Sequence, residues 1–340
     1  MNMRLRSRAH RPLLVTSLVA TTALLAGCSQ NIPDTPDMGG ATPVASPPAD
    51  NPAGTVIGYT AAITDLEVAD GDILGVRTED TLAIGTVSDF EAGTETTLEV
   101  DAGCGDLTAT GDRFVLACEQ GAFIIDATDP DLDDLRATET PTTVAALTSD
   151  GILITGNDVD EDVTVYRDGQ EPVTFDVQDP GTEMIAVPVE DRHDAVVRIW
   201  NGATTIQDID YPNDRPGATL RVGLGVGQMA GGEDGLLVVS DNIGGQIAIY
   251  NADDIIRLHM TAPVGDDPWG VAWDAANDLA WITTLSDNQL TGYRISEGVP
   301  EEQRRLDTVA DARNVVVLED GTLVVASASG DGLQVIESPA

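Results

Sequence analysis

The chain has 340 residues, 34 of them glycine and 18 proline, and a formal net charge of −41 at pH 7. This excess of Asp and Glu excludes nucleic acid and an anionic membrane surface as electrostatic partners. Hydrophobic residues make up 42% of the chain, enough for a sizeable core, and beyond the N-terminal leader no apolar run is long enough to span a bilayer.

Residues 1–27 have the features of an export signal. Four arginines precede an apolar run over residues 13–25, which is too short for a mature membrane span and has the length of a signal-peptide core. The run ends in Leu-Ala-Gly-Cys, which resembles the lipobox of bacterial lipoproteins. The resemblance implies cleavage before Cys28, acylation of Cys28 and a lipid anchor on the extracytoplasmic face of the cell membrane. A generic signal peptide that happens to contain a cysteine is the alternative.

Residues 28–54 are predicted to form a disordered tether between the lipidated cysteine and the folded domain. Prolines alternate there with Ala, Ser, Asp and Gly, and aromatic residues are absent. Such a segment buries too little apolar surface to offset its ordering entropy, so we expect it to be extended and mobile. The folded domain is then expected over residues 55–340.

A repeat with a period near forty residues fills this domain. Each copy has a short strand, a turn rich in Asp and Gly, a β-branched run such as "GILIT" or "TLVVAS", a polar loop and an alternating third strand. Such repeats predict an all-β fold without helices, a seven-bladed β-propeller with four-stranded blades. The copies begin at Asp65, Asp106, Thr143, Glu183, Gln228, Trp269 and Arg313.

The ring is expected to close through its N-terminal strand. The seventh copy has three strand signals before the chain ends, and "TVIGYTA" over residues 55–61 can supply the fourth. This arrangement would hide both sheet edges.

The repeats also resemble a known family. "WITT" and "LVVAS" stand where the YVTN/NHL-type seven-bladed propellers carry their signature. With its lipobox, the chain is similar to the propeller lipoproteins of actinobacteria of the LppL kind. The resemblance implies a fold and a location, and it assigns no catalytic residues.

Cys104 and Cys118 are predicted to form a disulfide, because the implied compartment is oxidising. They flank a hairpin that turns at residues 110–112, and their spacing places them opposite each other across it. Two free buried thiols are the alternative.

Few residues point to catalysis. No Gly-x-Ser-x-Gly motif occurs, and after the leader the only histidines are His193 and His259, each in polar surroundings typical of the surface. Acidic stretches at 126–135 and 157–163 could supply oxygen ligands for Ca²⁺, although neither has EF-hand spacing, and solvated loops are the alternative. The sequence predicts no cofactor, and a bound Ca²⁺ ion is the one alternative that these acidic stretches leave open.

The residues that open the innermost strands would ring one mouth of the central channel, which makes them the candidate ligand site. Trp269 would offer a flat apolar face, and Arg313 could hold an acidic group. The alternative is that these side chains only hydrate the mouth. The predicted set comprises Asp65, Asp106, Thr143, Glu183, Gln228, Trp269 and Arg313.

Two functions fit these features. The first is a membrane-anchored binding or scaffold module for a protein, a peptide or another envelope ligand such as a small polar molecule. The alternative is a propeller hydrolase or lactonase in which Asp65, Asp106 and Glu183 hold a divalent cation and Trp269 supports the substrate. The scarcity of histidine and the lack of a local catalytic motif favour the binding module.

Overall fold

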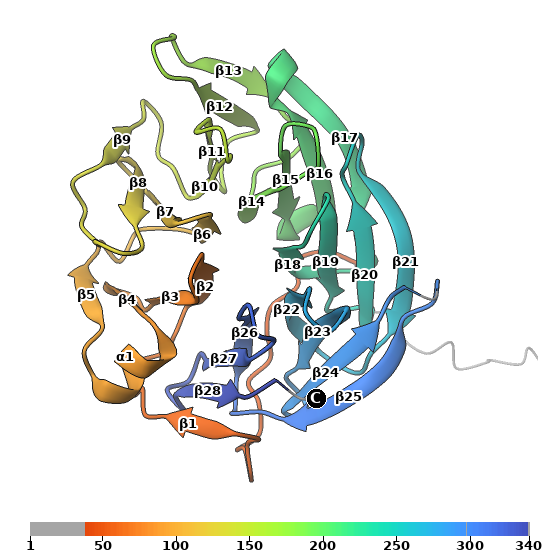
Figure 1. Cartoon of the computed structure of the whole chain (residues 1–340). Helices are drawn as coiled ribbons and strands as arrows, with labels where there is room; N and C mark the ends of the chain where they lie inside the picture. The colour runs from red at the N-terminus through yellow and green to blue at the C-terminus, as the bar shows by residue number, and fades with distance from the viewer. Residues whose placement is uncertain (1–37, 297, 339–340) are drawn as a thin grey trace, which may run out of the picture. The chain divides into compact units, whose positions relative to one another are not determined.

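A computed structural model describes residues 38–296 and 298–338, so the leader and Cys28 lie outside the described residues. The described part contains seven four-stranded antiparallel sheets arranged in a ring as the blades of a β-propeller (Figure 1). This confirms the predicted fold. None of the described helices is long and apolar enough to cross a membrane.

The first four blades follow the chain in order, each from its inner strand outward. Blade 1 comprises β2 (Asp65–Ala69), β3 (Ile73–Arg77), β4 (Thr81–Gly85) and β5 (Thr96–Glu99). Blade 2 comprises β6 (Leu107–Thr110), β7 (Arg113–Cys118), β8 (Gly121–Asp126) and β9 (Leu135–Ala137). Blade 3 comprises β10 (Val144–Leu147), β11 (Leu153–Gly156), β12 (Asp162–Tyr166) and β13 (Val173–Asp176). Blade 4 comprises β14 (Glu183–Val187), β15 (Ala195–Trp200), β16 (Thr205–Asp210) and β17 (Arg215–Arg221).

The last three blades complete the ring. Blade 5 comprises β18 (Val226–Gly231), β19 (Leu236–Asp241), β20 (Gln246–Asn251) and β21 (Arg257–Pro263). Blade 6 comprises β22 (Pro268–Asp274), β23 (Leu279–Thr284), β24 (Gln289–Arg294) and β25 (Glu301–Asp307). Blade 7 comprises β26 (Ala312–Val317), β27 (Leu323–Ser327), β28 (Leu333–Ile336) and β1 (Thr55–Ile57).

Blade 7 takes its outer strand from the N-terminal side of the domain, as predicted. In the antiparallel ladder between β1 and β28, Thr55 pairs with Val335 and Ile57 pairs with Leu333 (Figure 1). The first and last parts of the domain therefore share one sheet, and the pairing covers the edge that β28 would otherwise expose.

The second strand of each blade shows why these β-branched runs form the core. Every residue of β27 and of β23 is buried, because both faces of these strands pack against neighbouring strands and blades. In blade 6, Trp281 is fully buried and its indole N–H donates to Asp274 Oδ2 over 3.1 Å. A Cβ at Gly292 would lie 2.9 Å from the Trp281 ring, so glycine makes room for this side chain.

One short helix departs from the predicted all-strand pattern. α1 (Val87–Ala92) lies between β4 and β5 and begins with a capping box, in which Thr86 and Asp89 each accept a hydrogen bond from the backbone of the other. Phe90 is its buried residue. At six residues the helix is too short for a helical period to be visible in the sequence.

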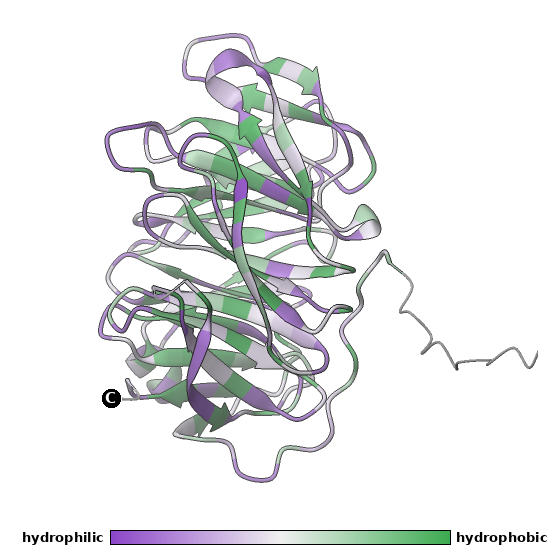
Figure 2. Ribbon diagram, turned by 90° about the vertical axis from the view of Figure 1, so that its right-hand side faces the viewer, coloured by the Kyte–Doolittle hydropathy of each residue, from purple (hydrophilic) through white to green (hydrophobic). Residues whose placement is uncertain are grey.

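Residues 38–54, which we call the N-terminal arm, correct the prediction of a mobile tether over 28–54. The arm lies along one face of the ring (Figure 2). The Gly39 N–H donates to Leu224 O (3.0 Å), and the Ser46 N–H donates to Asp311 Oδ1 (3.0 Å). Near its end, Ala53 N–H donates to Asp307 O (2.9 Å). Residues 28–37 lie outside the described residues, so the tether remains a prediction there.

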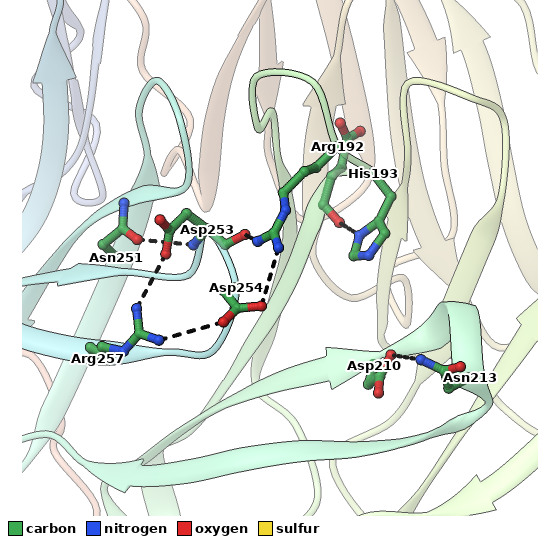
Figure 3. A network of polar contacts seen from close by, with 9 residues as sticks. Arg192, His193, Asp210, Asn213, Asn251, Asp253, Asp254 and Arg257 are labelled. Atoms are coloured by element: carbon green, nitrogen blue, oxygen red, sulfur yellow. Dashed lines mark hydrogen bonds and ion pairs between the residues drawn. The ribbon is translucent and has the colours of Figure 1, made fainter.

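The opposite face carries a polar network between blades 4 and 5 (Figure 3). Arg192, in the loop between β14 and β15, forms an ion pair with Asp254 (3.3 Å), and Arg257 pairs with both Asp253 (3.5 Å) and Asp254 (3.6 Å). These side chains are about half exposed, so each pair contributes at most about 1 kcal/mol. His193 packs edge-on against Tyr211 (ring centroids 5.5 Å apart), which gives it a structural role.

Candidate ligand site in the central channel

The inner strands of the seven blades surround a cavity of about 790 Å³. We call the face of the ring at which these strands begin the strand-start face. Arg313 is the predicted site residue that does not line the cavity, and its place is taken by Asn314. The predicted residues that do line it are Asp65, Asp106, Thr143, Glu183, Gln228 and Trp269.

A β-bulge explains why Arg313 was wrongly predicted. The pairing of β26 with β27 shifts register between Ala312 and Asn314, which leaves Arg313 as the extra residue. Arg313 instead contacts Asp311, with 3.6 Å between Nη2 and Oδ1. Asn314 accepts a hydrogen bond from Gln228 Nε2 over 3.0 Å, which links blades 7 and 5 at the channel.

Blades 5 and 6 have the same irregularity, and blades 1 to 4 do not. The register of β18 shifts between Val226 and Met229, and that of β22 shifts between Pro268 and Val271. The inner ladders of blades 1 to 4 are regular. The arm contacts all three bulged blades and, through Met38 and Arg221, the end of blade 4. The arm therefore covers one side of the channel mouth and leaves the other side, with the inner strands of blades 1 and 2, uncovered.

The arm covers the aromatic residue predicted as a stacking platform. Trp269 is only 8% exposed and packs in a cluster with Ala41 and Leu285, with Ile243 against it. The prediction that Trp269 presents an open apolar face is therefore wrong, because a segment expected to be disordered lies on it.

The other side of the mouth, which we call the acidic side, holds four carboxyl groups from blades 1, 2 and 4. Asp65 Oδ2 accepts from the Leu107 N–H over 2.9 Å. Asp106 Oδ2 accepts from the Met184 N–H over 3.2 Å, and both carboxylate oxygens of Glu183 lie within 3.3 Å of the Met229 nitrogen. Each acidic residue at a strand start thus binds the backbone of another blade, which fixes its position.

Glu67 is the fourth member of the acidic side. It lies two residues after Asp65 in β2 and lines the same cavity. None of the described residues donates a hydrogen bond to its carboxylate. This residue was missed in the sequence, although the period of two along a strand would have placed it on the same side as Asp65.

Burial raises the pKa of all four carboxyls, and repulsion between carboxylates adds to this effect at Glu67, Asp106 and Glu183. Burial raises the pKa of Asp65 to about 6, against the opposing effects of its hydrogen bonds and of Arg77. Burial, followed by the charges of Asp65 and Asp106, raises the pKa of Glu67 well above its usual range. Burial also raises the pKa of Asp106 and Glu183, with Asp65 adding to the first and Asp106 to the second.

Arg77 is the basic residue within this group. It pairs with Asp65 in the β2–β3 ladder, and its Nη2 donates to the Cys104 carbonyl oxygen. The side chain is 7% exposed, and its Nε has no hydrogen-bond partner among the described residues. Burial lowers its pKa, although Asp65 and Asp106 oppose this effect.

The disulfide between Cys104 and Cys118 is present beside Arg77, as predicted. The two cysteines were expected to lie directly opposite each other in the hairpin, but the observed strand register differs from the expected one by one residue. In the β6–β7 ladder Leu107 pairs with Leu116 and Thr110 with Arg113, so Cys104 lies before β6 and has no partner in the ladder. The bond holds the Cys104 backbone, and with it the carbonyl that accepts from Arg77.

At its other end the cavity is apolar. The inner strands finish there with Val68, Ala230, Trp273 and Val317, which line the cavity together with the ends of neighbouring strands. Trp273 is partly exposed and also lines an adjoining hollow of about 210 Å³. The channel thus changes from acidic to apolar along its axis.

The acidic loops at 126–135 and 157–163 are organised by their own hydrogen bonds. Asp126 accepts from the Thr128 N–H over 2.8 Å, and Asn157 accepts from the Val159 N–H over 2.8 Å. Over residues 38–296 and 298–338 no group of three or more His, Cys, Asp or Glu side chains is placed to hold a metal ion.

Comparisons with known proteins show the fold alone. The chain matches no family model and no curated protein. It is similar to a chain of the mitotic checkpoint complex (TM-score 0.64, 14% identity, 99% of each chain covered) and to the WD40 repeats of RRP9 (TM-score 0.66, 14% identity, 85% of this chain and 99% of that chain). It is also similar to the Pan2 WD40 domain of Neurospora crassa (TM-score 0.60, 10% identity, 83% of this chain and 90% of that chain).

Proposed function

We propose that the chain is a membrane-anchored, extracytoplasmic propeller lipoprotein that binds a protein or peptide of the cell envelope at its central channel. The observation that carries the proposal is the convergence of polar residues from the inner strands on one cavity of about 790 Å³. Convergent polar groups in a concave site are the usual mark of ligand recognition. The similarity to the WD40 repeats of RRP9 and to a chain of the mitotic checkpoint complex supports a protein or peptide partner.

The anchor in this proposal rests on the lipobox that ends at Cys28. Mass spectrometry of the mature protein tests this part: an acylated Cys28 at the N-terminus is expected, and an unmodified Cys28 would contradict it.

Site-specific photo-crosslinking in intact cells tests the binding proposal. Asp158 is exposed and lines the cavity at the strand-start face, which suits it for replacement by a photoreactive residue. Gln303, exposed on the outer strand β25, provides the matched control. We expect a discrete adduct with an envelope protein or peptide from position 158 and none from position 303. Adducts from position 303 alone, or from neither position, would contradict binding at the channel.

A further inference from the structure

We propose that the acidic side of the channel binds the guanidinium or ammonium group of a basic side chain carried by a peptide. This inference rests on the proposed binding function and names the chemistry of its ligand. The acidic side consists of Asp65, Glu67, Asp106 and Glu183, with Arg77 beside them.

The charge balance of the cavity favours a cation. Five carboxyl groups line it, the four of the acidic side and Asp158 at the mouth, and Arg77 is the basic residue that lines it with them. Three of the four carboxyls are held in place by backbone N–H groups, while Glu67 accepts no hydrogen bond from a described residue. A carboxylate fixed among like charges gains most from an opposite charge that approaches it directly.

Arg77 provides the second observation and indicates that the ligand also has an acceptor. Its side chain is 93% buried at the cavity wall, and Nε has no partner among the described residues. An unpaired buried donor costs about 1–3 kcal/mol, which a ligand acceptor can recover once the side chain adjusts. A peptide supplies both groups, because a basic side chain is flanked by backbone carbonyls.

The shape and polarity of the cavity fit such a ligand. About 790 Å³ lies within the range of sites that hold small molecules, so the cavity has room for a basic side chain and its flanking peptide groups. Beyond the carboxyls, Val68, Ala230 and Val317 form an apolar wall beside Trp273. The methylene groups of Arg or Lys pack well against such surfaces while their charged ends bind carboxylates.

Cation binding is expected to release protons. In the free protein burial holds the pKa of each carboxyl of the acidic side above its usual range, and repulsion adds to this at Glu67, Asp106 and Glu183. A cation placed among them favours their ionised forms, so affinity should rise with pH. The charged groups that face this position are Asp65 and Glu67 on β2, Arg77 on β3, Asp106 before β6, Glu183 on β14 and, at the mouth, Asp158.

Calorimetric titration of the full-length protein with N-acetyl-arginine methylamide tests the proposal at pH 8. Its neutral counterpart, the citrulline derivative, keeps the shape and removes the charge. Ethylguanidine provides a free cation without peptide groups, and CaCl₂ provides a metal cation. We expect the arginine derivative to bind roughly tenfold or more tightly than the citrulline derivative and more tightly than ethylguanidine. Equal binding of the arginine and citrulline derivatives, preference for ethylguanidine, or preference for Ca²⁺ would each overturn the proposal.

Matched variants locate the site. E67Q removes one charge from the acidic side, and E79Q removes one from the exposed turn between β3 and β4. We expect E67Q to weaken arginine binding roughly tenfold and E79Q to leave it unchanged. If E67Q fails to fold, E183Q replaces it with the same expectation. If E67Q, or E183Q in its place, binds the arginine derivative as tightly as E79Q does, the proposal is overturned. Crosslinks from position 158 would in that case still support the proposed function, with a ligand of different chemistry in the channel.

Discussion

Asp106, at the start of blade 2, accepts a hydrogen bond over 3.2 Å from the backbone N–H of Met184 in blade 4. The contact joins two blades that are not consecutive in the chain. It brings the residue that precedes β6 next to the start of β14, and with it the carboxyl of Asp106 next to that of Glu183. Bonds of this kind make the acidic side of the channel part of the framework of the ring.

The first prediction concerns this bond. D106A leaves the Met184 N–H without its acceptor, so we expect the free energy of unfolding to fall by about 1–3 kcal/mol. D106N keeps an acceptor oxygen at the same place and should lose less. Urea unfolding of both variants measures the difference. A D106A protein as stable as D106N would show that the bond contributes nothing.

The second prediction concerns the pH dependence of stability. The pKa of Glu67 is raised in the folded protein, whereas in the unfolded chain it returns to about 4.3. The folded state therefore keeps a proton that the unfolded state loses. The contribution of Glu67 to the free energy of unfolding is greatest below about pH 4 and decreases as the pH rises through the pKa of the folded state. We expect E67Q to melt roughly 2–4 °C above the wild type at pH 8.

The same comparison at pH 4 should show little gain, because Glu67 is then mostly protonated in both states. E79Q serves as the control, and its melting temperature should follow that of the wild type at both pH values. A pH-independent effect of E67Q would mean that repulsion within the acidic side is absent.

The third prediction concerns the arm. Deletion of residues 38–47 removes Ala41 from Trp269, so the indole should become accessible to water. We expect a red-shifted tryptophan emission and stronger quenching by acrylamide. Adding W269F to the deletion should abolish both changes, since the other tryptophans do not belong to this cluster. Unchanged quenching after the deletion would contradict the arm's position.

The fourth prediction concerns the disulfide. The Cys104–Cys118 bond closes a loop of about 15 residues, for which restriction of the unfolded chain gives about 3 kcal/mol. The double variant C104A/C118A should unfold at lower urea concentration than the wild type. Reductant should shift the wild-type midpoint and leave that of the double variant unchanged. If reductant does not change the urea midpoint of the wild type, the predicted stabilisation by the disulfide is contradicted.

The architecture could be predicted from the sequence because its signals recur. Turns such as that at Gly71 and Asp72, both with positive φ, appear in most copies and set the period near forty. A bulge adds a single residue and leaves no such signal. Asp65 and Glu183 were therefore predicted correctly to line the channel, because their strands are regular. Arg313 was predicted in place of Asn314, because the bulge in β26 makes Asn314 the residue that lines the cavity.

The arm could not be predicted for a different reason. Its composition lacks the apolar residues that normally order a segment, and composition was the basis for expecting a tether. The ring holds it through backbone groups, such as the Gly39 N–H and the Pro47 carbonyl that accepts from Asn288, with Ala41 as its buried side chain. Such contacts depend on the partner surface, which exists only after the ring has formed.

Hydrogen–deuterium exchange of the full-length protein, with and without N-acetyl-arginine methylamide, tests the central claim most directly. Binding in the channel predicts slower exchange in the inner strands β2, β6 and β14, which carry or adjoin the acidic side, and no change in the outer strand β25. Protection confined to outer strands, or absent from the inner strands, would contradict the claim that the channel is the binding site.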